Sequence, residues 1–336
     1  MLHKFSPIAP PFVKRFYVKS EIILRLILNY KYDLDRFLKW SSVNQNINSQ
    51  TKLRALITMD YHRLEKGLAL KMPKVGFGKD VIARLLYNIP QYVEKYDWDE
   101  TALITLNTLL AYHNFNSQHG LIDQDLYKKI ISWKSSVPEK FISFNQGGTT
   151  KVTKSYIIES SNIDLLKFLE SRYSVRNFTD ENVNIELLKK AIFMAQKTPS
   201  VCNRQSSKVY LFTSEDDKRK VLSYQNGNRG FGEQASNVLI VVSDLENFTS
   251  TGERNQCWID GGMYAMSLVY AFHSLGLGTC CLNWSVGKGT DQALKKATGI
   301  KDSESIIMMI AVGHLPDELS VAQSPRKELE EVLIIK

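Results

Sequence analysis

The chain has 336 residues, of which 43% are hydrophobic and 23% charged, an ordinary balance for a globular protein. This composition excludes a disordered chain, a collagen-like repeat and a small disulfide-rich scaffold, and the length indicates two structural units. The formal net charge is +8. Residues 1–150 hold 21 basic and 13 acidic side chains, whereas residues 151–336 hold 22 of each, so the whole excess lies in the first part of the chain.

The first part of the chain is predicted to be helical, because apolar residues recur there at spacings of three and four. Pro90 is expected to kink or divide the third helix. The polar segment Asn145–Thr150 is typical of a linker, so we assign residues 1–145 to one helical region. The predicted helices are Glu21–Trp40, Gln50–Leu68, Lys79–Tyr96, Asp99–Phe115 and Gln124–Val137.

Helices and strands alternate in the second part, which we assign to residues 155–336. Its strands carry few polar residues, which indicates a sheet covered on both faces, and the mixture predicts an α/β or α+β domain. The predicted helices are 162–171, 185–196, 215–224, 257–275 and 291–298. The predicted strands are 208–213, 238–243, 279–284 and 305–312.

The four cysteines lack the spacing of metal ligands, and adjacent Cys280 and Cys281 could pair only with strain. We therefore expect reduced thiols in a cytoplasmic protein that holds no metal. Met1–Pro11 lacks the apolar core of a signal peptide. Ile22–Leu28 is too short to span a bilayer.

Two segments carry residues suited to a phosphorylated heterocycle. Arg172, Ser174 and Arg176 alternate along the chain, and guanidinium groups bind phosphate through paired hydrogen bonds; the alternative is a helix end with solvated arginines. Asn203 and Gln205 follow on a loop, where amide groups can pair with a ring edge; the alternative is an ordinary polar loop.

In this order the two segments resemble the flavin-dependent nitroreductase family. The resemblance runs from about residue 160 to 336 and continues through four further segments. These are Asp260–Gly262, Gly276–Cys280, Ile310–Pro316 and Pro325–Leu329. The resemblance implies a nitroreductase-like α+β fold, FMN as cofactor, NADH or NADPH as electron donor and a homodimer.

The resemblance also implies roles for particular residues. Arg172, Tyr173 (through its backbone), Ser174 and Arg176 hold the phosphate and ribityl chain, with Arg326 and Lys327 closing on the phosphate. The flavin ring is contacted across the dimer interface by Pro199, Ser200, Asn203 and Gln205. The N5 side is covered by Cys281, Leu282 and Asn283, and Asn228 lies near the pyrimidine edge.

Two features in and beside this loop bear on how the flavin ring would be held. The family usually has Pro-Trp after the glutamine, where this chain has Ser206 and Ser207, so packing beside the ring is expected to differ. Arg204 is a candidate for raising the flavin potential from near N1, because reduction builds negative charge there. Its alternatives are substrate contact and plain solvent exposure.

A dense polar segment, Asp60–Gly67, lies in the helical region. One interpretation is structural, with Gly67 ending the helix and two basic side chains placed near its negative end. The other has the segment reach over the flavin cavity to select a substrate. The residues concerned are His62, Arg63, Glu65 and Lys66. This layout resembles nitroreductases of bacterial polysaccharide-synthesis clusters.

We expect an FMN-dependent NAD(P)H oxidoreductase that reduces an unidentified small molecule, with a link to polysaccharide biosynthesis. The alternative is a non-catalytic flavin- or anion-binding module docked through its basic helices. No nucleic-acid-binding signature is present. Residues 1–59 hold 10 basic and 3 acidic side chains, so this segment is predicted to contact an anionic surface, such as a membrane face or a phosphorylated substrate.

Overall fold

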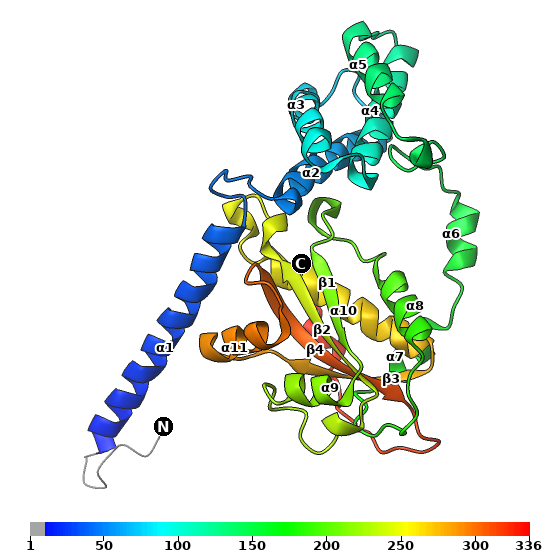
Figure 1. Ribbon diagram of the computed structural model, residues 1–336. Helices are drawn as coiled ribbons and strands as arrows, with labels where there is room; N and C mark the ends of the chain where they lie inside the picture. Colours follow the sequence, from blue (N-terminus) through cyan, green and yellow to red (C-terminus); the bar gives the residue numbers. More distant parts are fainter. Residues whose placement is uncertain (1–10) are drawn as a thin grey trace.

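The computed structural model describes residues 11–336, so the signal-peptide expectation for Met1–Pro11 lies almost wholly outside the described residues. A small helical unit stands at one end of a larger sheet domain, and the long helix α1 (Pro11–Trp40) runs beside the sheet domain (Figure 1). The helical unit is formed by α2 (Gln50–Leu68), α3 (Lys79–Tyr96), α4 (Glu100–Gln118) and α5 (Gln124–Ser135).

A four-stranded antiparallel sheet organises the second part of the chain, in the order β1-β2-β4-β3. The strands are β1 (Ser207–Phe212), β2 (Asn237–Asp244), β3 (Leu277–Asn283) and β4 (Glu304–His314). Because the strands are antiparallel and the helices lie on the sheet, the domain is α+β, as predicted. The helices are α6 (Lys154–Ser160), α7 (Leu165–Glu170), α8 (Ile185–Ala195), α9 (Glu215–Leu222), α10 (Gln256–Ser274), α11 (Lys288–Thr298) and α12 (Leu329–Val332).

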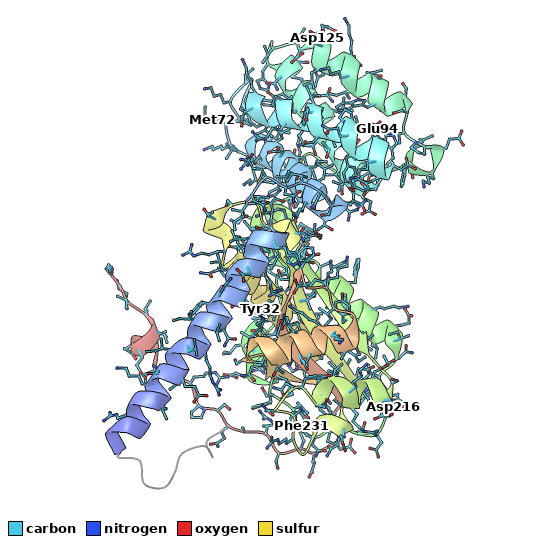
Figure 2. The ribbon with its side chains drawn as sticks, turned by 60° about the vertical axis from the view of Figure 1, so that its left-hand side comes forward. Tyr32, Met72, Glu94, Asp125, Asp216 and Phe231 are labelled. Atoms are coloured by element: carbon cyan, nitrogen blue, oxygen red, sulfur yellow. The ribbon has the colours of Figure 1, made fainter. Side chains whose placement is uncertain are left out.

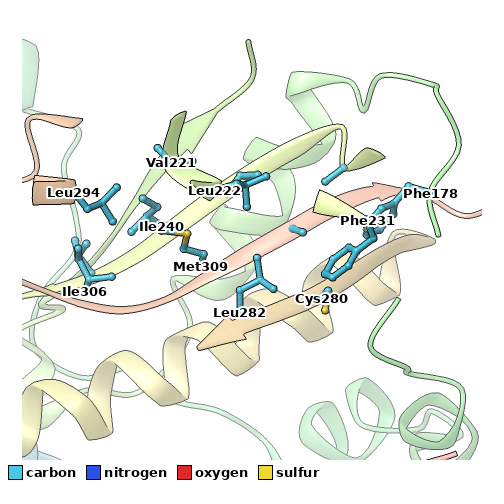
Figure 3. Packing of buried hydrophobic residues seen from close by; sticks show 14 of the residues in the cluster. Phe178, Val221, Leu222, Phe231, Ile240, Cys280, Leu282, Leu294, Ile306 and Met309 are labelled. Atoms are coloured by element: carbon cyan, nitrogen blue, oxygen red, sulfur yellow. The ribbon is translucent and has the colours of Figure 1, made fainter. Parts of the chain in front are cut away.

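Both faces of the sheet are covered, which confirms the prediction from the apolar strands. Val238, Ile240 and Val242 of β2 belong to one core cluster, with side chains of α9 and α11. Leu239 and Val241 belong to another, with α8 and α10. Successive side chains of a strand point to opposite faces, so one strand serves two cores. Figure 3 shows the first cluster, where Leu222 and Leu294 lie over Ile240 and Met309.

The helical unit has its own core, which includes Leu64, Leu85, Leu109 and Ile130, all inaccessible to solvent. Its helices begin and end within a few residues of the predicted positions. The expectation that Pro90 divides the third helix is wrong, since α3 continues through it. Pro90 is exposed, so water can hydrate the backbone carbonyl that its missing N–H leaves unpaired.

Helix α1 packs on the sheet domain rather than on α2–α5. Arg36 donates hydrogen bonds to the carbonyls of Asp302 at 2.9 Å and Glu304 at 2.8 Å. Phe37 packs in a small apolar cluster with residues of the sheet domain, and Figure 2 shows Tyr32 where α1 meets that domain. The boundaries assigned to the two regions remain predictions, but α1 makes its contacts with the second one.

Two buried carboxylates face each other across the sheet. Asp244 and Glu304 are partners in the register of β2 and β4, and each is at most 1% exposed. The Lys208 ammonium donates to both, at 2.7 and 2.9 Å. Burial lowers the pKa of Lys208, but hydrogen bonds and charge from the two carboxylates outweigh it and raise the pKa of Lys208 to about 12. This lysine therefore offsets part of the negative charge of the carboxylate pair.

We expect Lys208→Met to lower the free energy of unfolding by about 2 kcal/mol at pH 8, because the carboxylate pair loses its cation. The loss is smaller than for a fully buried ion pair because the Lys208 side chain is half-exposed. Folding raises the pKa of Lys208, so its stabilisation is complete below the unfolded pKa of about 10.4 and is lost as the pH rises towards about 12. Urea unfolding of both proteins at pH 8 and pH 11.5 should show the difference shrinking by about half. An unchanged difference would contradict this account.

Candidate functional site

The segment that contains Arg172, Ser174 and Arg176 is attached to the first half of β3. Ser174 forms a parallel bridge with Thr279, and the Val175 N–H donates to the Thr279 carbonyl at 2.8 Å. A Cβ on Gly278 would lie 3.1 Å from the Val175 side chain, so the close approach requires glycine at that position. An extended chain alternates its sides, and buried Val175 therefore leaves Ser174 and Arg176 exposed.

A cavity of about 600 Å³ lies beside this segment. Its lining includes Arg172, Tyr173, Ser174, Arg176 and Arg326. Among the described residues, no ion pair joins any of the three arginines to a carboxylate. Three guanidinium groups thus share one cavity, and the Glu170 carboxylate in its lining forms no ion pair with any of them. Lys327 is paired with Glu331 at 3.4 Å and is not part of the lining.

The end of β3 places its three predicted residues differently. The Leu282 side chain is buried in the core, so only its backbone is available to a ligand, whereas Cys281 and Asn283 are exposed. Gln225, a buried residue that sequence reasoning missed, donates to the Asn283 carbonyl at 3.1 Å. The Asn228 amide donates to the Leu222 carbonyl at 2.8 Å, so it stabilises the turn after α9.

The second predicted group lies around a separate cavity of about 150 Å³. Pro199, Ser200 and Gln205 line it together with Asp260 of α10, and it shares no lining residue with the arginine cavity. Asn203 is in the adjoining 3₁₀ turn. One chain therefore does not bring the two predicted groups together into a single cavity.

The loop that carries the second group is strained. Cys202, Asn203 and Gln205 have φ values of 49°, 55° and 49°, in the left-handed region that non-glycine residues rarely adopt. Residues held there cost about 1–3 kcal/mol each and cluster at functional sites. Two hydrogen bonds hold the loop: Val201 N–H donates to the Asp260 carboxylate at 3.1 Å, and Gln205 N–H donates to the Ser200 hydroxyl at 2.9 Å.

Arg204 has a structural position in this loop, and the alternative of plain solvent exposure is wrong. Its side chain is 1% exposed and forms an ion pair with Glu253. It also donates to the Val201 carbonyl and to the Thr249 hydroxyl, each at 3.2 Å. Burial raises the pKa of Glu253, but Arg204 and two backbone N–H groups outweigh it and lower that pKa. Sequence reasoning missed Glu253 because it lies 49 residues away in the chain.

Helix α2 connects the helical unit to the strained loop. It packs against the 3₁₀ turns Val201–Asn203 and Leu245–Asn247, in the region where the two parts of the molecule meet (Figure 1). The Thr249 hydroxyl lies 3.8 Å from the Met59 sulfur. His62 lies three residues after Met59 and Lys66 seven residues after it, so both share its side of the helix.

His62 and Arg63 of α2 have partners inside the helical unit. His62 contacts Glu65 at 3.1 Å. Arg63 contacts buried Asp60 at 3.4 Å, and Asp60 also accepts two hydrogen bonds from Arg84. Gly67 does not end the helix, as the structural interpretation supposed, because the C-cap is Ala69. A Cβ at Gly67 would lie 2.1 Å from the Phe77 ring, so Gly67 permits close packing.

Comparison with known proteins identifies the fold of the sheet domain. The model of the nitroreductase family matches residues 169–228 and 220–314. The matched part of the chain has the nitroreductase fold. The family model leaves residues 1–168 unmatched, so the likeness of the helices to polysaccharide-associated nitroreductases remains a prediction.

Three solved structures illustrate the similarity of the nitroreductase-like domain. An FMN-dependent nitroreductase from Clostridium difficile is 20% identical, with 51% of this chain and 99% of that chain covered and a TM-score of 0.44. A nitroreductase family protein from Streptococcus pneumoniae is 18% identical (52% and 100% covered, TM-score 0.45). A nitroreductase-like protein from Streptococcus mutans is 19% identical (52% and 98% covered, TM-score 0.45). No curated protein matches the chain.

Within residues 11–336, none of the helices combines the length and the apolar character needed to cross a membrane. The same residues contain no group of three or more His, Cys, Asp or Glu side chains arranged to hold a metal ion. All four cysteines are free thiols.

The buried pair in the strained loop predicts non-additive stability changes. Arg204→Met and Glu253→Gln should each lower the free energy of unfolding by about 3 kcal/mol, because each leaves one buried charge without its partner. The double variant should lose clearly less than the sum, as measured by urea unfolding. Lys189→Met, which removes an exposed pair with Glu186, should change stability by less than about 0.5 kcal/mol. Strict additivity of the two loop variants would contradict the ion-pair account.

Proposed function

We propose that the protein is an FMN-dependent oxidoreductase that takes electrons from NADH or NADPH and reduces an unidentified small molecule. The observation that supports it is the cavity shared by Arg172, Ser174, Arg176 and Arg326. A phosphate monoester carries about −1.5 to −2 charges at neutral pH, and guanidinium groups bind its oxygens in pairs. The donors present therefore fit the phosphate of FMN.

The rest of the cofactor site would follow β3. From the phosphate near Ser174 the strand leads past Cys281 to Asn283, and exposed groups at its end would meet the ring. When bound, FMN accepts a hydride at N5 and passes two electrons to an acceptor. The role of this chain is to bind the phosphate, to place the ring and to supply backbone N–H groups near N5.

A homodimer would complete the site, since Pro199, Ser200, Asn203 and Gln205 lie away from the arginine cavity in one chain. Ile259 and Met263 of α10 support a second copy, because these large apolar side chains are 53% and 39% exposed. Large apolar side chains at a surface are typical of protein interfaces. A second copy would bring its strained loop to the ring.

Substrate selection is the role that we propose for the helical unit. α2 packs on the loop predicted to contact the ring. His62 and Lys66 lie on the same side of α2 as Met59, and Glu65 is in contact with His62. Arg63 is tied to Asp60 and would act through it. The link to polysaccharide biosynthesis rests on the layout of the chain alone, and a cytoplasmic location is in keeping with four free thiols.

Binding of FMN tests the phosphate site. Arg172→Ala and Arg176→Ala should each weaken FMN binding about 10- to 100-fold, because each removes charge-assisted hydrogen bonds to phosphate. Quenching of FMN fluorescence by the full chain measures the dissociation constants. Arg219→Ala is the matched control, since Arg219 is exposed on α9 and outside the cavity. The proposal fails if the unaltered protein takes up no FMN or if all variants bind it equally.

Anaerobic addition of NADH or NADPH to the FMN-loaded protein then separates two functions. Loss of the visible flavin absorbance within seconds is the result expected of an oxidoreductase. A bound flavin that neither nucleotide reduces would instead favour the alternative, a non-catalytic flavin-binding module.

We also propose that α1 contacts an anionic membrane surface. Ile23, Ile27, Leu34 and Leu38 are 46–58% exposed. Apart from buried Arg36, α1 carries six basic side chains against three acidic ones. Apolar side chains together with basic ones are typical of helices that lie on anionic membranes.

Co-sedimentation with phosphatidylserine vesicles tests this contact. Ile27→Gln together with Leu34→Gln should weaken binding roughly tenfold, since two apolar side chains no longer enter the bilayer while the charge is unchanged. Tyr87→Gln, at a position of α3 that is 71% exposed, should leave binding unchanged. Equal sedimentation of both variants, or none of the unaltered protein, would count against a membrane contact.

A further inference from the structure

A cleft of about 610 Å³ separates α1 from the segment that follows β3. Its lining combines Tyr32 of α1, Trp258 of α10, Trp284 after β3, and Lys288 and Asp291 of α11. The family model begins at residue 169, so one wall of this cleft comes from a helix outside the matched domain.

One carboxylate holds two of the aromatic walls. Asp291 accepts hydrogen bonds from the Tyr32 hydroxyl at 2.7 Å and from the Trp284 indole N–H at 2.9 Å, and Lys295 forms an ion pair with it at 2.8 Å. Burial raises the pKa of Asp291, but Lys295 and the two aromatic donors outweigh it and lower that pKa. The ionised carboxylate therefore fixes the phenol and the indole relative to each other before any ligand binds.

The third aromatic wall is half open to water, and Asp33 and Arg36, one charge of each sign, also belong to the lining. Trp258 is 45% exposed and lies in the first turns of α10. Large aromatic faces supply much of the binding energy for planar ligands, because they bury area and favour stacked or edge-on ring contacts. The cleft thus offers two fixed aromatic side chains and one that a ligand would cover.

Lys288 places a positive charge at the edge of the cleft. It is exposed, and its ammonium lies 5.6 Å from the centre of the Tyr32 ring. Within the described residues no carboxylate is paired with it. The backbone N–H of Lys288, the first residue of α11, donates to the Asn29 side chain of α1 at 3.0 Å. This hydrogen bond holds the start of α11 against α1.

The cleft adjoins the place proposed for the flavin ring, because Trp284 directly follows Asn283, the last residue of β3. We infer that this cleft binds the substrate of the enzyme as a planar aromatic molecule that carries an acidic group, with the ring against Trp258 and Trp284 and the acid at Lys288. The substrate assignment rests on the proposed function, whereas the binding chemistry rests on the cleft alone.

Calorimetric titration of the full chain with 2-naphthoate tests the binding chemistry, and neutral 2-naphthalenemethanol is the comparison ligand. The acid should bind about tenfold more tightly than the alcohol, because only the acid pairs with the ammonium. Lys288→Met should abolish that preference, and Lys296→Met, on an exposed position of the same helix, should retain it. Trp258→Leu should weaken both ligands about tenfold through loss of aromatic contact. Absence of naphthoate binding, or an unchanged preference in Lys288→Met, would overturn the inference.

Titrating the protein with and without FMN separates the two proposals. Naphthoate binding that depends on Lys288 in a chain that takes up no FMN would support the cleft and reject the proposed function. A flavin that NADH or NADPH reduces, in a chain that binds no naphthoate, would support the proposed function and reject the cleft.

Discussion

The β-bridge and hydrogen bond that join residues 174 and 175 to Thr279 position the arginine segment of the proposed cofactor site. It brings an arginine-bearing segment against a strand whose other edge is paired with β4. Successive side chains of an extended chain point to opposite sides, so burial of Val175 directs Ser174 and Arg176 outward. The same strand leads to Asn283 and Trp284, so one strand joins the arginine cavity to the aromatic cleft.

Local patterns were enough to predict the helices, the strands and the arginine segment, because periodicity and alternation depend on residues close together in the chain. The surroundings of Arg204 and the partner of α1 could not be predicted in this way. Arg204 is neutralised by Glu253 and α1 is held by Asp291, and both contacts join residues that only the tertiary fold brings together. The role of Gly67 could not be predicted either, because the Phe77 ring that packs against it is brought there by the tertiary fold and not by the sequence around Gly67.

Helix α1 reverses the usual arrangement of a surface helix. Such a helix normally turns its apolar side to the core, but α1 is held largely by polar groups, Asn29, Tyr32 and Arg36, while Ile27 and Leu34 are exposed. Hydrogen bonds and an ionised carboxylate fix an orientation more narrowly than apolar packing does, because they depend on angle as well as distance. This suits a helix that must present one wall of a cleft at a set position and a second, apolar side to another surface.

The strained loop gives a physical reason for the helical unit to lie where it does. Three left-handed residues cost about 1–3 kcal/mol each, a sum comparable with the net stability of a whole domain. The Arg204–Glu253 pair, the hydrogen bond to Asp260 and the packing of α2 on Val201–Asn203 all act on this one loop. A helical unit docked elsewhere could still influence substrate access, but it could not share in holding the strained conformation. Its contact with the loop therefore joins two tasks, stabilising the loop and placing side chains of α2 beside it.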